Sequence, residues 1–112
     1  MKLKPDVSIL TSFLFILDID YPHDDAVVEF ICSSNINDKE ELLGVFYRVV
    51  KPEYECCTED EKKWLIDTLR FYLKRGEAFE SVFDRRNLLF SEKVVDGRKF
   101  METLLESLIG CR

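Results

Sequence analysis

Residues 58–76, with the sequence TEDEKKWLIDTLRFYLKRG, carry the strongest structural signal in the chain. Thr58 and Glu61 form a capping box, in which each side chain accepts a hydrogen bond from the backbone amide of the other residue. The apolar residues that follow fall on one face of a helix: Trp64, Leu65, Leu69, Tyr72 and Leu73. Two basic residues occupy the last turn, and Gly76 stands where a left-handed residue commonly ends a helix. The stretch therefore predicts an amphipathic helix between Thr58 and Gly76.

Two further helices are expected before residue 35. Asp6 is an N-cap candidate for a helix over residues 7–17, whose apolar side chains nearly surround the axis and predict an element central to the core. The β-like string at residues 13–17 leaves a core strand as the alternative. Tyr21-Pro22 then breaks the chain, and a short helix is expected over residues 23–33.

A third helix is expected to start at Asn37, because Glu40 follows at capping-box spacing, and to stop at Pro52. Beyond the helix of residues 58–76, apolar residues at helical spacing extend a helical pattern over residues 77–86. Both stretches carry enough apolar side chains to pack against the central helices.

The sequence is ambiguous over residues 87–97. Asp96-Gly97 is typical either of a short β-hairpin turn or of the cap of the next helix. The final helix is expected to end at Gly110. The spacings together predict an all-α, compact single domain over residues 1–112, built from about six short helices, with a short β-hairpin at residues 87–97 as the alternative.

Composition agrees with one folded domain. Apolar residues make up 46% of the 112 residues, and nine Phe, four Tyr and one Trp supply bulky core material. The chain holds only four Gly and three Pro, which favours helices over a turn-rich β-sandwich. Most of the Phe residues fall on helical stripes, so we assign them to core packing.

The net charge of −6 is distributed unevenly. Residues 1–61 hold 14 acidic against 5 basic side chains, and residues 62–112 hold 8 against 11. An acidic half repels phosphates, so direct binding of DNA or RNA is disfavoured, whereas encounter with a basic protein is accelerated. The alternative is that the acidic residues only keep a small protein soluble.

No pattern of residues suggests catalysis, and we predict that the chain is not an enzyme. His23 is the only histidine, and neither a P-loop nor a G-x-G-x-x-G motif occurs. The four cysteines include the adjacent pair Cys56-Cys57 but no C-x-x-C, so we expect reduced thiols. The segment Asp18 to Pro22 lacks the glycine and distal glutamate of a calcium loop. We expect no metal and no organic cofactor.

The start of the chain imitates a signal peptide, because residues 1–4 are basic and residues 7–17 are apolar. Pro5 and Asp6 interrupt that pattern, Asp18 closes it, and no small-residue cleavage site follows. The apolar run is also shorter than the roughly 20 residues that span a bilayer. We therefore expect a cytoplasmic protein without membrane contact.

Two acidic clusters and two tyrosines are the candidate partner-binding residues. They are Asp18, Asp20, Asp24 and Asp25 in the first cluster, Glu53, Glu55, Glu59, Asp60 and Glu61 in the second, and Tyr47 and Tyr54 beside them. Carboxylates can hold the Lys and Arg side chains of a partner, and tyrosine is favoured as an interface anchor. The alternative is that several of these carboxylates only satisfy helix starts.

In size, charge and helical pattern the chain resembles bacterial toxin-immunity proteins, in particular the immunity partners of contact-dependent growth inhibition systems. The two acidic clusters and the capped helix at residues 58–76 carry this resemblance. It implies tight one-to-one binding to a cognate toxin domain, often a basic nuclease, whose active site is occluded. The alternatives are a regulatory adaptor or subunit of a larger assembly, and a small enzyme or redox protein built around Cys56-Cys57.

Overall fold

The computed structural model describes residues 4–77 and 79–109. Its helices, in chain order, are α1 (Val7–Phe13) continued by a 3-10 turn (Leu14–Leu17), α2 (Asp25–Ser33), α3 (Lys39–Val45), a π turn (Phe46–Val50), α4 (Lys51–Glu55), α5 (Glu59–Lys74), α6 (Glu80–Asp84) and α7 (Gly97–Ile109). Because α3, the π turn and α4 are continuous, the described residues form six unbroken helical runs. They contain no strand, only one isolated bridge between Asp18 and Leu88. The prediction of an all-α domain is confirmed.

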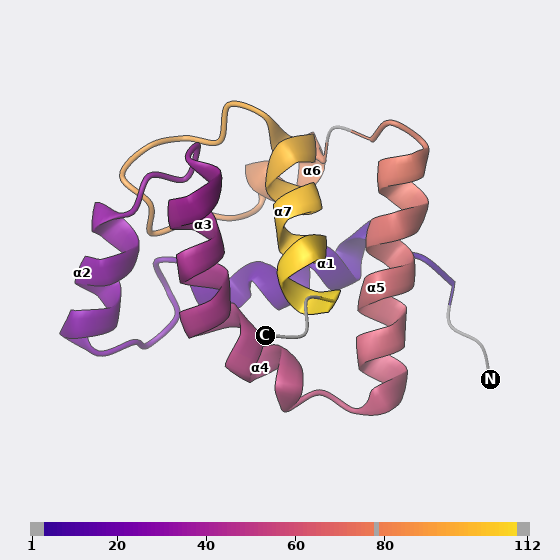
Figure 1. Cartoon of the computed structure of the whole chain (residues 1–112), viewed down its shortest axis with the longest axis horizontal. Helices are drawn as coiled ribbons and strands as arrows, with labels where there is room; N and C mark the ends of the chain where they lie inside the picture. Colours follow the sequence, from indigo (N-terminus) through magenta and orange to yellow (C-terminus); the bar gives the residue numbers. More distant parts are fainter. Residues whose placement is uncertain (1–3, 78, 110–112) are drawn as a thin grey trace.

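The helices pack around α7, which lies between α3 and α5 in Figure 1, while α1 crosses behind it and α2 lies at one end of the long axis. Phe100 of α7 is 2% exposed and stands at the centre of the core. Its ring meets Phe46 edge-on at 5.2 Å and Phe83 at 5.1 Å between centroids. Such T-shaped pairs add to the free energy gained from burial alone.

Helix α5 forms as its sequence predicts. The Thr58 hydroxyl accepts from the Glu61 amide at 3.1 Å, and the Glu61 carboxylate accepts from the Thr58 amide at 2.9 Å. At the other end Gly76 adopts φ +79°, and the Gly76 and Glu77 amides donate to the carbonyls of Leu73 and Tyr72. These two bonds make a Schellman motif, which ends the helix cleanly.

Helix α1 is also confirmed, with Asp6 as its N-cap accepting from the Ser8 amide at 2.9 Å. Its last residues tighten into the 3-10 turn, so the expected helical span of residues 7–17 holds and the strand alternative is wrong. Leu10, Leu14 and Leu17 recur on one face and are fully buried, which makes this helix part of the core, as expected.

Two boundaries of the third helix differ from the prediction. Asp38, rather than Asn37, is the N-cap, accepting from the Glu40 amide at 3.0 Å, while the Asn37 side chain bonds the backbone at residues 93–95. Pro52 does not stop the helix. A proline lacks the amide and crowds the carbonyl four residues back. Here the preceding π turn, in which Lys51 donates to Phe46 five residues back, changes the register and places Pro52 in the first turn of α4.

The helix expected over residues 77–86 forms only as α6. Phe79 adopts φ +62°, which prevents an α-helix from passing through it, and its ring is fully buried. Residues 87–95 form a loop rather than a hairpin, and Asp96 caps α7 by accepting from the Lys99 amide at 3.1 Å. The hairpin alternative is therefore wrong and the capping alternative is confirmed. The expected helix end at Gly110, like Ala78, lies outside the described residues.

One core polar group offers a test of the packing. Thr68 on α5 is fully buried, and its hydroxyl has no hydrogen-bond partner within the described part of the chain. Replacing Thr68 by Val should raise the free energy of unfolding by about 1 kcal/mol, because the isosteric methyl carries no unmet hydrogen bond. Urea denaturation of both proteins measures the difference.

The matched control is Thr103→Val on α7. Thr103 is equally buried, but its hydroxyl donates to the Lys99 carbonyl at 2.8 Å. Its replacement should give no comparable gain. A Thr68→Val protein less stable than the wild type would show that the Thr68 hydroxyl is satisfied in solution.

Candidate partner-binding surface

Asp18 lies inside the protein, with 3% of its surface exposed. One carboxylate oxygen accepts from the Asp20 amide at 2.9 Å, and the other accepts from the Asn87 amide at 3.1 Å and lies 3.5 Å from Nη1 of Arg86. This corrects the prediction for Asp18. Its carboxylate joins the loop after the 3-10 turn to the segment after α6, and it is not presented to a partner.

Arg86 is also held against the protein by several contacts. Its Nε donates to the Thr11 carbonyl at 2.7 Å, and its guanidinium lies 5.1 Å from the centre of the Phe15 ring. The side chain is only 21% exposed. The Arg86 guanidinium is therefore paired with Asp18 and with the backbone of α1, and it is not presented to a partner.

The rest of the first acidic cluster is exposed. Asp20, Asp24 and Asp25 lie on the surface around the start of α2, at the lower left of Figure 1. Asp24 is at the same time the N-cap of α2, because its carboxylate accepts from the Val27 amide at 3.0 Å. Asp25 lies in the first turn, where the helix dipole favours a negative charge.

The second acidic cluster surrounds the link between α4 and α5. Its five members are exposed: Glu53, Glu55, Glu59, Asp60 and Glu61. Glu61 belongs to the capping box. Lys62, whose side chain is 20% exposed, lies 3.7 Å from both Glu55 and Glu59. Pairs of this length with exposed carboxylates contribute little, and one ammonium among five carboxylates leaves the cluster negative.

The two clusters lie along the same edge of the molecule. In Figure 1 the start of α2 and the link from α4 to α5 both form the lower border of the view, with α4 between them. Segments about thirty positions apart in sequence therefore lie along one border of this view, whereas Asp18 is buried.

The two candidate tyrosines have different positions. Tyr47 on the π turn is 37% exposed and remains available for contact. Tyr54 is 9% exposed, and its ring packs edge-on against Phe13 at 6.5 Å. Burial raises the pKa of the Tyr54 hydroxyl, although the nearby Lys62 ammonium opposes the shift. Tyr54 is therefore a core residue, and its expected role as a surface anchor is corrected.

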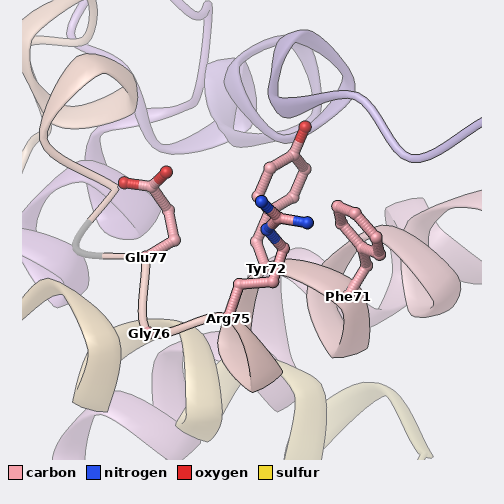
Figure 2. A pocket seen from close by; sticks show the side chains of 5 residues that line it. All are labelled: Phe71, Tyr72, Arg75, Gly76 and Glu77. Carbon is pink, nitrogen blue, oxygen red and sulfur yellow. The ribbon is translucent and has the colours of Figure 1, made fainter.

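A shallow hollow of about 570 Å³ lies at the C-terminal end of α5 (Figure 2). It is lined by Phe71, Tyr72, Arg75, Gly76 and Glu77. The Arg75 guanidinium lies 5.1 Å from the centre of the Phe71 ring, and the Phe71 and Tyr72 rings meet edge-on at 5.0 Å. Aromatic side chains, one guanidinium and one carboxylate thus line the hollow.

The described histidine and cysteine side chains do not form a common site. Nε2 of His23 lies 2.6 Å from the Ile16 carbonyl, and the His23 ring lies tilted against the Tyr21 ring, with 4.6 Å between centroids. Cys32, Cys56 and Cys57 are free thiols, and Cys111 lies outside the described residues. Across residues 4–77 and 79–109 no group of three or more His, Cys, Asp or Glu side chains is placed to hold a metal ion.

None of the helices in the described ranges is long and apolar enough to cross a membrane. Comparison with known proteins finds no matching family, no matching curated protein and no matching solved structure. The candidate surface must therefore be argued from its own residues.

Sequence reasoning missed several exposed apolar side chains. Among them, Phe15 is 38% exposed, Ile19 is 62% exposed and Phe71 is 40% exposed. A signal was present for two of these three. Ile19 stands between two aspartates in a segment that ends at Pro22, and Phe71 lies off the apolar stripe of its helix. Phe15 gave no such signal, because the whole run around it is apolar.

The structural role of Asp18 can be tested by mutation. Asp18→Ala should lower the free energy of unfolding by roughly 3 kcal/mol, because it leaves the Arg86 guanidinium and the Asn87 amide without their acceptor. The control is Asp20→Ala, because Asp20 lies in the same loop but is exposed. This substitution should change the free energy of unfolding by less than about 0.5 kcal/mol. Equal effects in thermal or urea unfolding would contradict the assignment of Asp18 to the interior.

The Cys57 thiol provides a test of the redox alternative. Burial raises its pKa, and the carboxylates of Glu61 and Glu53 raise it further. Since the thiolate is the reacting form, Cys57 should be alkylated by iodoacetamide more slowly in the folded protein than in urea, with a midpoint at higher pH. Mass spectrometry of the Cys57 peptide measures both rates. Faster reaction in the folded protein would instead indicate an activated thiol.

Proposed function

We propose that the protein is a non-catalytic immunity protein, which binds a cognate bacterial toxin domain one to one and occludes its active site. The exposed acidic edge carries this proposal. Eight carboxylates share it: Asp20, Asp24, Asp25, Glu53, Glu55, Glu59, Asp60 and Glu61. Of the basic side chains, Lys62 lies within 4 Å of two of them.

Electrostatics support a basic partner. Carboxylates gathered on one edge produce a negative potential that steers a cationic surface toward that edge and disfavours an acidic one. A nuclease toxin binds phosphates through Lys and Arg side chains, so a row of carboxylates can occupy the same cations. The proposed partner is therefore a basic nuclease domain, and no nucleic acid, membrane or cofactor enters the proposed function.

Tyr47 supplies a contact of another kind. It lies on the π turn between α3 and α4, and its ring is partly exposed. Tyrosine combines a large apolar face with a hydroxyl and is enriched among the residues that dominate binding energy. We include Tyr47 in the proposed interface and leave out Asp18 and Tyr54, which are buried.

The proposal is tested by titration calorimetry against the product of the adjacent upstream reading frame, at two salt concentrations. The tested variant carries Glu53→Gln, Glu55→Gln and Asp60→Asn, which leaves the capping residue Glu61 unchanged. It should bind at least about tenfold more weakly than the wild type and depend less on salt, because three charges are lost from the contact.

The control variant carries Glu80→Gln, Asp84→Asn and Glu92→Gln, which removes two exposed carboxylates from α6 and one from the loop before α7. Its net charge is the same, so equal weakening in both variants would mean that overall charge, and not the acidic edge, governs binding. Absence of binding by the wild type would reject the immunity role. Tight binding that ignores salt would favour an adaptor that uses an apolar face.

A further inference from the structure

Three partly exposed apolar side chains lie together at the start of the acidic edge. This aromatic patch consists of Phe15, Ile19 and Tyr21. The Phe15 and Tyr21 rings meet edge-on at 5.5 Å, and Ile19, on the loop between them, is 62% exposed. Large apolar side chains left in water on a small domain commonly mark a contact surface.

Internal hydrogen bonds hold the loop that carries the patch. The Ile19 amide donates to the Asn87 carbonyl at 2.8 Å, and the Tyr21 amide donates to the Asp18 carbonyl at 3.0 Å. Because Asp18 is anchored inside the protein, the next side chain in the loop is turned outward. The patch is therefore held in one conformation before any partner arrives, which lowers the entropy lost on binding.

Carboxylates border the patch. Asp20 lies within the same loop, and Asp24 and Asp25 follow Tyr21 within four residues, all three exposed. An apolar centre with a charged rim is the usual anatomy of a protein interface. The negative rim makes the complementary surface cationic.

The Phe15 ring already accommodates one guanidinium. Arg86 of the same chain lies 5.1 Å from the ring centre, at the distance where a cation is attracted by the face of an aromatic ring. The arrangement shows the chemistry that suits this part of the surface, namely an arginine or lysine whose stem lies on apolar atoms and whose charge meets carboxylates.

We propose that the aromatic patch is the anchor point for an Arg- or Lys-rich surface of a partner protein. This inference rests on the proposed function, since it names the part of the acidic edge where the basic partner makes its central contact. Cation–π contact and apolar burial at the patch supplement the charge pairing at the rim, so affinity does not depend on screened surface charges alone.

The test uses a defined probe, the hexa-arginine peptide, in a ¹⁵N NMR titration of the full chain. The largest chemical-shift changes are expected at residues 15–25 and smaller ones at residues 53–61. Changes confined to residues 53–61, or spread evenly over all carboxylates, would overturn the proposal. The titration does not need the toxin, so it can succeed or fail independently of the proposed immunity role.

A variant pair sharpens the result. Ile19→Gln removes an exposed apolar side chain without removing core atoms, and it should weaken peptide binding about fivefold. Val95→Gln is the control, because Val95 is 85% exposed but lies in the loop before α7, beside Lys39 and Lys99. It should leave the affinity unchanged. Equal affinities of wild type and Ile19→Gln would also overturn the proposal.

A second copy of the chain is the competing occupant, since exposed basic residues lie toward the end of α5: Arg70, Lys74 and Arg75. Sedimentation of the free protein at increasing concentration tests this. A monomer whose state does not change with Ile19→Gln supports a foreign basic partner. Self-association abolished by Ile19→Gln would assign the patch to contacts between copies and overturn the proposal.

Discussion

The buried contact between Asp18 and Arg86 is the constraint on which the acidic half of the structure depends. A carboxylate taken out of water is costly unless its oxygens are satisfied, and Asp18 meets that condition with two backbone amides and one guanidinium. Arg86 then reaches the Thr11 carbonyl. These contacts fix three segments to one another: α1, the loop at residues 18–24 and the segment after α6. The position of that loop determines where α2 begins and which side chains around it face water.

The acidic residues divide into those that the fold needs and those that it does not. Asp24 and Glu61 cap helices, and the dipoles of α2 and α5 favour negative charge at their starts. Because both helices start at the same edge, folding alone places part of the negative charge there. Asp20, which lies outside any helix, and Glu55, at the C-terminal end of α4, have no such role within the described residues. This surplus, rather than the total charge, is what supports a binding role over simple solubility.

The sequence predicted those elements whose signals are local. The helix at residues 59–74 carries its own capping box and terminal glycine, and Asp6 caps its helix as expected. Elements fixed by distant contacts were not predictable in this way. Residues 87–95 have no periodicity, because the Leu89 amide bonds the Leu17 carbonyl and Asn37 bonds the backbone at residues 93–95. The local sequence predicts that Pro52 ends the helix, but the π turn before it removes the steric clash of the proline ring with the preceding turn. The burial of Asp18 and Tyr54 also depends on partners that no local pattern reveals.

Two stacks of arginine on phenylalanine show how the molecule keeps its charge polarity. Arg86 lies over Phe15 in the acidic half, but its charge is matched by Asp18, so it subtracts little from the negative potential of the exposed carboxylates. Arg75 lies over Phe71 on the surface at the other end of α5, where Lys74 and Arg70 add positive charge. In Figure 1 this end of α5 and the start of α2 occupy opposite corners. A charge distribution of this kind orients an approaching basic protein toward the acidic edge before contact is made. In the proposed complex, long-range steering and short-range anchoring act on the same surface, because the aromatic patch lies within the acidic edge.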